Sequence, residues 1–87
     1  MWVQQREYKK LGIVLRAARE AAGLTQQMLA KRLSKPQSFV SSYESGQRRL
    51  DILEFLRMAA AIDADPIKLF AELLKAEPSL KSKSAKR

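Results

Sequence analysis

The side chains that could do chemistry in this chain gather on one short stretch, residues 37–45. If that stretch is a helix with Val40 facing inward, a step of about 100° per residue places four polar side chains on its outer face and flank. These side chains are Gln37, Ser38, Ser41 and Ser42. Their amide and hydroxyl groups offer hydrogen bonds to a partner, and the alternative interpretation is an ordinary solvated helix surface.

Catalytic chemistry is poorly represented in the sequence. The chain has no His and no Cys among its 87 residues. This removes imidazole bases, thiolate nucleophiles, disulfides and zinc-finger sites. The Asp and Glu residues show no paired arrangement on one helix face that would suggest metal binding or acid–base catalysis. We therefore expect no enzyme activity, no metal site and no cofactor.

Positive charge is concentrated in the first part of the chain. Lys and Arg number 17 against nine Asp and Glu, a net charge of +8. Residues 1–50 contain ten basic and three acidic side chains, residues 51–77 three and six, and residues 78–87 four and none. A segregated basic surface favours polyanions, because neutralised phosphates release their counterions. Charge that only maintains solubility is the alternative.

Length and hydropathy place the chain among small soluble domains. Eighty-seven residues suit one domain. No apolar run approaches the roughly 18–20 residues that span a bilayer, and nothing resembles a signal peptide. We expect a cytoplasmic protein with no membrane partner and no evident small-molecule ligand.

Helical periodicity dominates the chain, and its stop and cap residues divide it into five helices. Gly23 ends the first helix, Thr25 caps the second, and Pro36 separates the second from the third. The expected helices cover residues 8–22, 26–33, 37–45, 51–62 and 65–76. We therefore predict an all-α, compact five-helix domain over residues 8–76. Residues 1–7 are an N-terminal arm or an extension of the first helix, and residues 77–87 are a basic, disordered tail.

The second and third helices are joined by a short turn and predict a helix-turn-helix, in which two helices cross steeply. A small residue, Ala30, lets the two backbones approach. Apolar side chains spaced to fill the angle between the helices are Leu29, Leu33, Val40 and Tyr43.

These residues belong to a wider pattern that resembles the Cro/XRE-type repressors. The pattern comprises Leu24-Thr25-Gln26, Leu29-Ala30, Leu33, Val40-Ser41, Tyr43-Glu44 and Gly46, and the resemblance extends from about Leu11 to Leu74. It implies a phage-repressor-like fold and a sequence-specific binder of double-stranded DNA. It also implies a homodimer that acts as a transcriptional regulator, a repressor, with the third helix in the major groove.

The resemblance assigns roles to individual residues. Gln37 and Ser38 match base-reading positions, Ser42 matches the one a turn later, and Ser41 lies beside them. Gln26 matches a residue that contacts the DNA backbone and supports the third helix. Phosphate contacts are expected from Gln26 and from three cations near the ends of the third helix, Lys35, Arg48 and Arg49. Arg19 and Glu44 match a structural salt bridge between the first and third helices.

Two features depart from the family pattern, and the role of a third residue, Phe39, stays open. Ser34 stands where glycine is common in a left-handed turn, at a cost of about 1 kcal/mol. Ser38 and Ser42 are short, so base reading rests mainly on Gln37. Phe39 is expected off the buried face, where it contacts a sugar or a thymine methyl or else packs against its own domain.

Apolar residues near the C-terminus exceed the needs of a small core. They include Phe55, Ile67, Phe70, Leu73 and Leu74, with Trp2 at the other end. Either all are core, or some form a homodimer interface that includes Phe70 and Leu74. An antitoxin or anti-repressor that acts through a protein partner is the alternative function, and a fragment of a larger regulator is a third.

Overall fold

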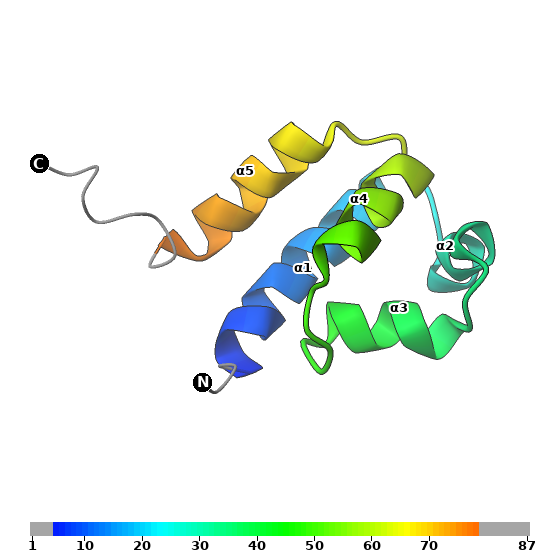
Figure 1. Ribbon diagram of the computed structural model, residues 1–87, viewed down its shortest axis with the longest axis horizontal. Coiled ribbons are helices and arrows are strands. Elements are labelled where there is room, and N and C mark those ends of the chain that lie inside the picture. The colour runs from blue at the N-terminus through cyan, green and yellow to red at the C-terminus, as the bar shows by residue number, and fades with distance from the viewer. Residues whose placement is uncertain (1–4, 79–87) are drawn as a thin grey trace, which may run out of the picture.

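The computed structural model describes residues 5–78, and this part of the chain is all-helical, as predicted (Figure 1). The helices are α1 Gln5–Ala21, α2 Gln26–Leu33, α3 Gln37–Glu44, α4 Ile52–Ala61 and α5 Pro66–Ala76. The first begins at Gln5 rather than Tyr8, so residues 5–7 extend it. The other observed ends agree with the predicted ones to within a residue. Trp2 and the tail from residue 79 lie outside the described residues.

The predicted caps explain where three of the helices begin. The Thr25 hydroxyl accepts from the Met28 N–H at 3.1 Å, Asp51 from that of Glu54 at 3.1 Å, and Asp65 from that of Ile67 at 2.9 Å. Each bond satisfies a first-turn N–H that has no partner within the helix. The second helix ends at Leu33, and its C-cap Ser34 has a φ of 57°, which confirms the left-handed turn without glycine.

One core joins all five helices. α1 packs against α3 and α5, and α4 packs against α2 and α5. The buried apolar side chains are Leu15, Leu24, Leu29, Ala30, Phe39, Val40, Tyr43, Phe55, Met58, Ala59, Ile62, Leu69 and Leu73. Burial of Leu29, Ala30, Val40 and Tyr43 confirms the predicted packing between α2 and α3.

The close crossing of α1 and α3 depends on Gly12, which sequence reasoning did not single out. A Cβ atom on Gly12 would lie 2.3 Å from the backbone oxygen of Glu44. Gly46 ends the segment after α3 with φ of 80°, and a Cβ there would lie 2.5 Å from the backbone nitrogen of Lys9. Both glycines therefore hold α3 against α1 at backbone distance.

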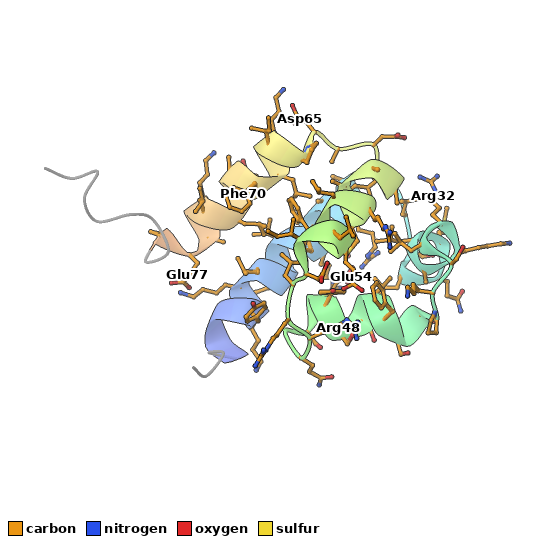
Figure 2. The ribbon with its side chains drawn as sticks, in the orientation of Figure 1. Arg32, Arg48, Glu54, Asp65, Phe70 and Glu77 are labelled. Carbon is orange, nitrogen blue, oxygen red and sulfur yellow. The ribbon has the colours of Figure 1, made fainter. Side chains whose placement is uncertain are left out.

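The described chain stays packed slightly beyond the boundary predicted for the domain. Glu77, placed in the tail by the sequence, is buried, and its carboxylate lies 3.3 Å from Lys10 of α1. This ion pair ties the end of α5 to α1 (Figure 2).

Candidate nucleic-acid interface

The outer face of α3 has the orientation that the helical step predicts. Val40 is 1% exposed, Gln37 and Ser38 are exposed, and Ser41 and Ser42 are half-buried. The hydroxyl of Ser42 donates to the carbonyl of Phe39 at 2.9 Å, and that of Ser41 donates to the carbonyl of Ser38 at 3.3 Å. Because these two hydroxyl protons point back into the helix, Ser41 and Ser42 present mainly acceptor lone pairs outward.

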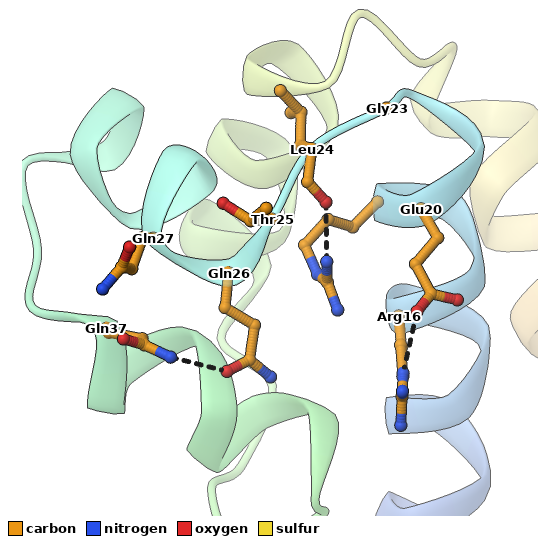
Figure 3. A pocket seen from close by; sticks show the side chains of 9 residues that line it. Arg16, Glu20, Gly23, Leu24, Thr25, Gln26, Gln27 and Gln37 are labelled. Carbon is orange, nitrogen blue, oxygen red and sulfur yellow. Dashed lines mark hydrogen bonds and ion pairs between the residues drawn. The ribbon is translucent and has the colours of Figure 1, made fainter.

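A chain of hydrogen bonds connects the protein interior with the start of α3. Arg19 donates to both carboxylate oxygens of Glu44, at 2.6 and 3.0 Å. The Gln26 amide nitrogen donates to Glu44 at 3.0 Å, and its oxygen accepts from the Gln37 amide nitrogen at 3.2 Å (Figure 3). The ion pair implied by the resemblance is therefore present, and the hydrogen bond that Gln37 donates to Gln26 links the start of α3 to α2.

The donor-to-acceptor direction of these hydrogen bonds follows from the chemistry of Arg19 and Glu44. A guanidinium only donates hydrogen bonds and a carboxylate only accepts them, so Glu44 must receive the amide N–H of Gln26. The Gln26 oxygen is then left for Gln37, which turns its amide nitrogen inward. Gln37 keeps its carbonyl oxygen and one N–H for a partner outside the protein.

Burial fixes the Arg19–Glu44 pair, which anchors this chain of hydrogen bonds. The two side chains are 7% and 6% exposed. The hydrogen bond to Glu44 raises the pKa of Arg19, desolvation opposes it, and the charges of Glu44 and Glu20 add to the increase. Arg19 also donates to the Leu24 carbonyl at 2.6 Å, which fixes the loop that enters α2.

An open polar cleft of about 680 Å³ lies between the end of α1 and the starts of α2 and α3 (Figure 3). Its lining includes Arg16, Gln26, Gln27 and Gln37, and Arg16 pairs with Glu20 at 3.2 Å. The first N–H groups of a helix carry a partial positive charge that suits a phosphate. Of the residues expected to contact DNA, Gln26 and Gln37 line this cleft, and Arg16 lines it as well.

The predicted cations at the ends of α3 differ in their surroundings. Lys35, Arg48 and Arg49 are all exposed. Arg48, however, lies 3.5 Å from Glu54 of α4, a partner that the sequence did not reveal.

Phe39 corrects one expectation. It is 9% exposed and packs edge-on against Tyr43, with ring centroids 5.1 Å apart. Packing within its own domain is thus the correct alternative, because the helical step places Phe39 beside Tyr43 on the flank that faces α4.

Large apolar side chains are also exposed on α4 and α5, and we call this set the apolar patch. Its most exposed large members are Ile52, Leu53, Leu56, Ile67 and Phe70. Phe70 is 53% exposed (Figure 2), whereas Leu74 is half-buried and lines a hollow of about 250 Å³ beside it. The sequence pointed to Ile67, Phe70 and Leu74 but missed the members on α4.

Two negative observations apply to residues 5–78. No group of acidic side chains there could hold a metal ion, and no helix is long and apolar enough to cross a bilayer.

The steep pair α2–α3, its capped turn and its exposed polar helix define a helix-turn-helix domain. The chain belongs to the XRE-type helix-turn-helix family, whose family model matches residues 15–69. Members of this family are DNA-binding transcriptional regulators, and this chain is one of them.

Solved structures support this assignment. An XRE-family like protein from Pseudomonas syringae pv. tomato str. DC3000 shares 45% identity over 84% of this chain and 89% of its own, with a TM-score of 0.72. The restriction-modification controller protein C.AhdI from Aeromonas hydrophila shares 35% identity over 75% of this chain and 94% of its own, with a TM-score of 0.69.

A third structure extends the similarity of fold. The clp gene regulator ClgR from C. glutamicum has a TM-score of 0.70, covers 94% of this chain and 100% of its own, and is 23% identical. No curated protein sequence is significantly similar to the chain.

Proposed function

We propose that the protein is a homodimeric repressor that inserts α3 into the major groove and reads bases chiefly with Gln37. The observation that carries the proposal is the chain Arg19–Glu44–Gln26–Gln37. It leaves the Gln37 oxygen and one N–H facing outward. A glutamine amide in this orientation pairs with the N6 and N7 groups of adenine.

The serines add less discrimination than Gln37. Ser38 is exposed at the start of α3, while Ser41 and Ser42 direct their protons to helix carbonyls. Hydroxyl groups fit several bases, so the proposed half-site has one strongly specified adenine with weaker preferences beside it.

Phosphate contacts position α3 over the groove. We assign them to Gln26 and Arg16 in the polar cleft, and to Lys35, Arg48 and Arg49 at the ends of α3. Thr25, Gln26 and Gln27 at the start of α2 line the same cleft, and the first N–H groups of a helix favour a bound phosphate. These contacts fix orientation and contribute no base preference.

A second copy of the chain is the proposed occupant of the apolar patch. One good bidentate base contact gives about 1–3 kcal/mol of discrimination, and a specific site needs about 4–10 kcal/mol over random DNA. Two subunits double the contacts, and the patch lies on α4 and α5 rather than on α3. Phe70 lies in this interface, and Leu74 borders the adjoining hollow. Half-sites would then lie about 34 Å apart.

Repression in the cytoplasm requires only that the dimer bind its DNA site. The proposed DNA-binding face of α3 and the proposed dimer interface are sufficient for this. Binding-site selection from random duplexes with the purified protein tests the proposal. We expect a two-fold symmetric site with an adenine in each half. A promoter that overlaps this site should be silenced when the protein is present. Recovery of asymmetric or unrelated sequences would contradict the proposal. Capture of a protein partner without DNA selection would favour the antitoxin alternative.

A further inference from the structure

Two aromatic rings form a platform on the flank of α3 that faces α4. The Phe39 and Tyr43 rings meet edge to face at 79°. The Arg48 guanidinium lies 4.8 Å from the Phe39 centroid and 5.4 Å from that of Tyr43, and the Lys35 ammonium lies 5.3 Å from the Phe39 centroid. Cations are attracted to such rings, so the platform holds Arg48 beside the outer face of α3.

Glu54 places a carboxylate against this platform from the first turn of α4 (Figure 2). One of its oxygens accepts a hydrogen bond from the Tyr43 hydroxyl. The other oxygen lies 3.5 Å from the Arg48 guanidinium. The Glu54 side chain is 21% exposed and that of Arg48 is 46% exposed, so the carboxylate is the fixed partner and the guanidinium the accessible one.

The contact between Glu54 and Arg48 balances charge and leaves the guanidinium donors available. At 3.5 Å it is an ion pair, and no residue in the described part of the chain accepts a hydrogen bond from Arg48. A phosphate can offer Arg48 two parallel hydrogen bonds, which form a shorter and stronger contact than this one.

We propose that Glu54 competes with DNA phosphate for Arg48 and thereby sets the preference for specific over random DNA. The inference rests on the proposed phosphate contact of Arg48. On random DNA the backbone is contacted loosely, so Arg48 stays neutralised by Glu54 and adds little affinity. At a specific site, α3 is docked in the groove and a phosphate is held opposite Arg48. This phosphate then replaces Glu54 as the partner of Arg48. Glu54 is therefore a positioning residue that weakens random binding more than specific binding.

The test is Glu54→Gln in the full chain. Glutamine retains an oxygen that accepts from the Tyr43 hydroxyl, and a melting curve verifies the fold. We expect affinity for a random-sequence duplex to rise about two- to fivefold, the exposed ion-pair energy expressed as a ratio. The log–log salt slope should steepen by up to about 0.9. Affinity for a selected duplex should rise less, so the ratio of specific to random affinity falls.

Two further variants isolate the role of Arg48. Glu72→Gln removes an equal charge from an exposed pair on α5, where Glu72 lies 3.3 Å from Lys75, and should change neither affinity nor slope. In an Arg48→Ala background, Glu54→Gln should have no effect on binding. A gain that persists without Arg48, an equal gain from Glu72→Gln, or no gain at all would overturn the role of Glu54.

The proposed function fails in a different way. If Arg48→Ala leaves affinity and salt slope unchanged, the phosphate contact of Arg48 is wrong, and the inference about Glu54 falls with it. If Arg48→Ala weakens binding and Glu54→Gln has no effect, only the competition by Glu54 is refuted.

Discussion

Gln37 donates a hydrogen bond to Gln26 across 3.2 Å and thereby joins the start of α3 to the start of α2. The same Gln26 donates to Glu44, whose carboxylate is held by the buried Arg19. The amide that we propose reads bases is thus oriented by three other side chains on three helices. Groups held in this way lose little freedom on binding, which favours affinity and discrimination.

The first prediction concerns this orientation. Gln26→Ala removes the support of Gln37, so changing the specified adenine to guanine should cost the variant less than the roughly 1–3 kcal/mol expected for wild type. Binding curves of both duplexes measure the difference. In the double variant with Gln37→Ala, the losses of discrimination between adenine and guanine caused by the two substitutions should not add, because both remove the same base contact. Additive losses would show that Gln26 acts independently of Gln37.

The second prediction concerns the buried ion pair between Arg19 and Glu44. Glu44→Ala leaves the Arg19 charge buried without its partner, so the free energy of unfolding should fall by about 3–5 kcal/mol. Glu72→Ala is the matched control. It breaks the Glu72–Lys75 pair, whose side chains are 57% and 72% exposed, and should cost under about 1 kcal/mol. Urea denaturation of the three proteins compares them, and equal losses would contradict the role of burial.

The fold was predictable because its signals are local. Glycine, proline and the caps Thr25, Asp51 and Asp65 lie next to the helix ends that they fix, and the apolar period reveals the inner face of each helix. What escaped prediction depends on residues far apart in sequence. The approach of Gly12 to the Glu44 backbone and the pairing of Arg48 with Glu54 exist only once the helices are assembled.

The candidate site was predictable to a different degree. Family resemblance supplied the Arg19–Glu44 pair and the position of Gln37, because these occupy fixed points of a repeated pattern. Phe39 was left between two roles, since a residue at the edge of a helical face is buried or exposed according to the neighbouring helix. The α4 part of the apolar patch was missed because the exposure of Ile52, Leu53 and Leu56 depends on how α4 packs against the other helices.

The third prediction concerns pH. The pKa of Arg19 is raised by its bond to Glu44, so its stabilising effect is complete at any pH below the ordinary arginine value. It would be lost only as pH rises through that raised pKa. The chain has no His and no Cys to titrate near neutrality. The free energy of unfolding should therefore be nearly constant between about pH 6 and pH 9, below the pKa range of Tyr and Lys and above that of the carboxylates. Urea titrations across this range measure it, and a steep slope would reveal an unrecognised titrating group.

The fourth prediction concerns Arg49, which is exposed and has no ion-pair partner in the described residues. If it contacts a phosphate, Arg49→Ala should flatten the log–log salt slope by about 0.9 per subunit and weaken binding to all sequences alike. Lys68→Ala, which removes an exposed charge from α5, should leave the slope unchanged. A slope unaffected by Arg49→Ala would remove this residue from the interface.

The last prediction concerns self-association through the apolar patch. Wild-type protein should sediment as a dimer at micromolar concentration, because covering Phe70 and its neighbours removes apolar area from water. Phe70→Glu places a charge in that contact and should yield a monomer that binds the selected duplex weakly and still melts cooperatively. Ile13→Glu is the matched control, since Ile13 is 66% exposed on α1 and does not belong to the patch, and this variant should remain dimeric. A wild-type protein that stays monomeric with and without DNA would refute the interface. An unchanged dimer in Phe70→Glu would move the interface elsewhere on the molecule.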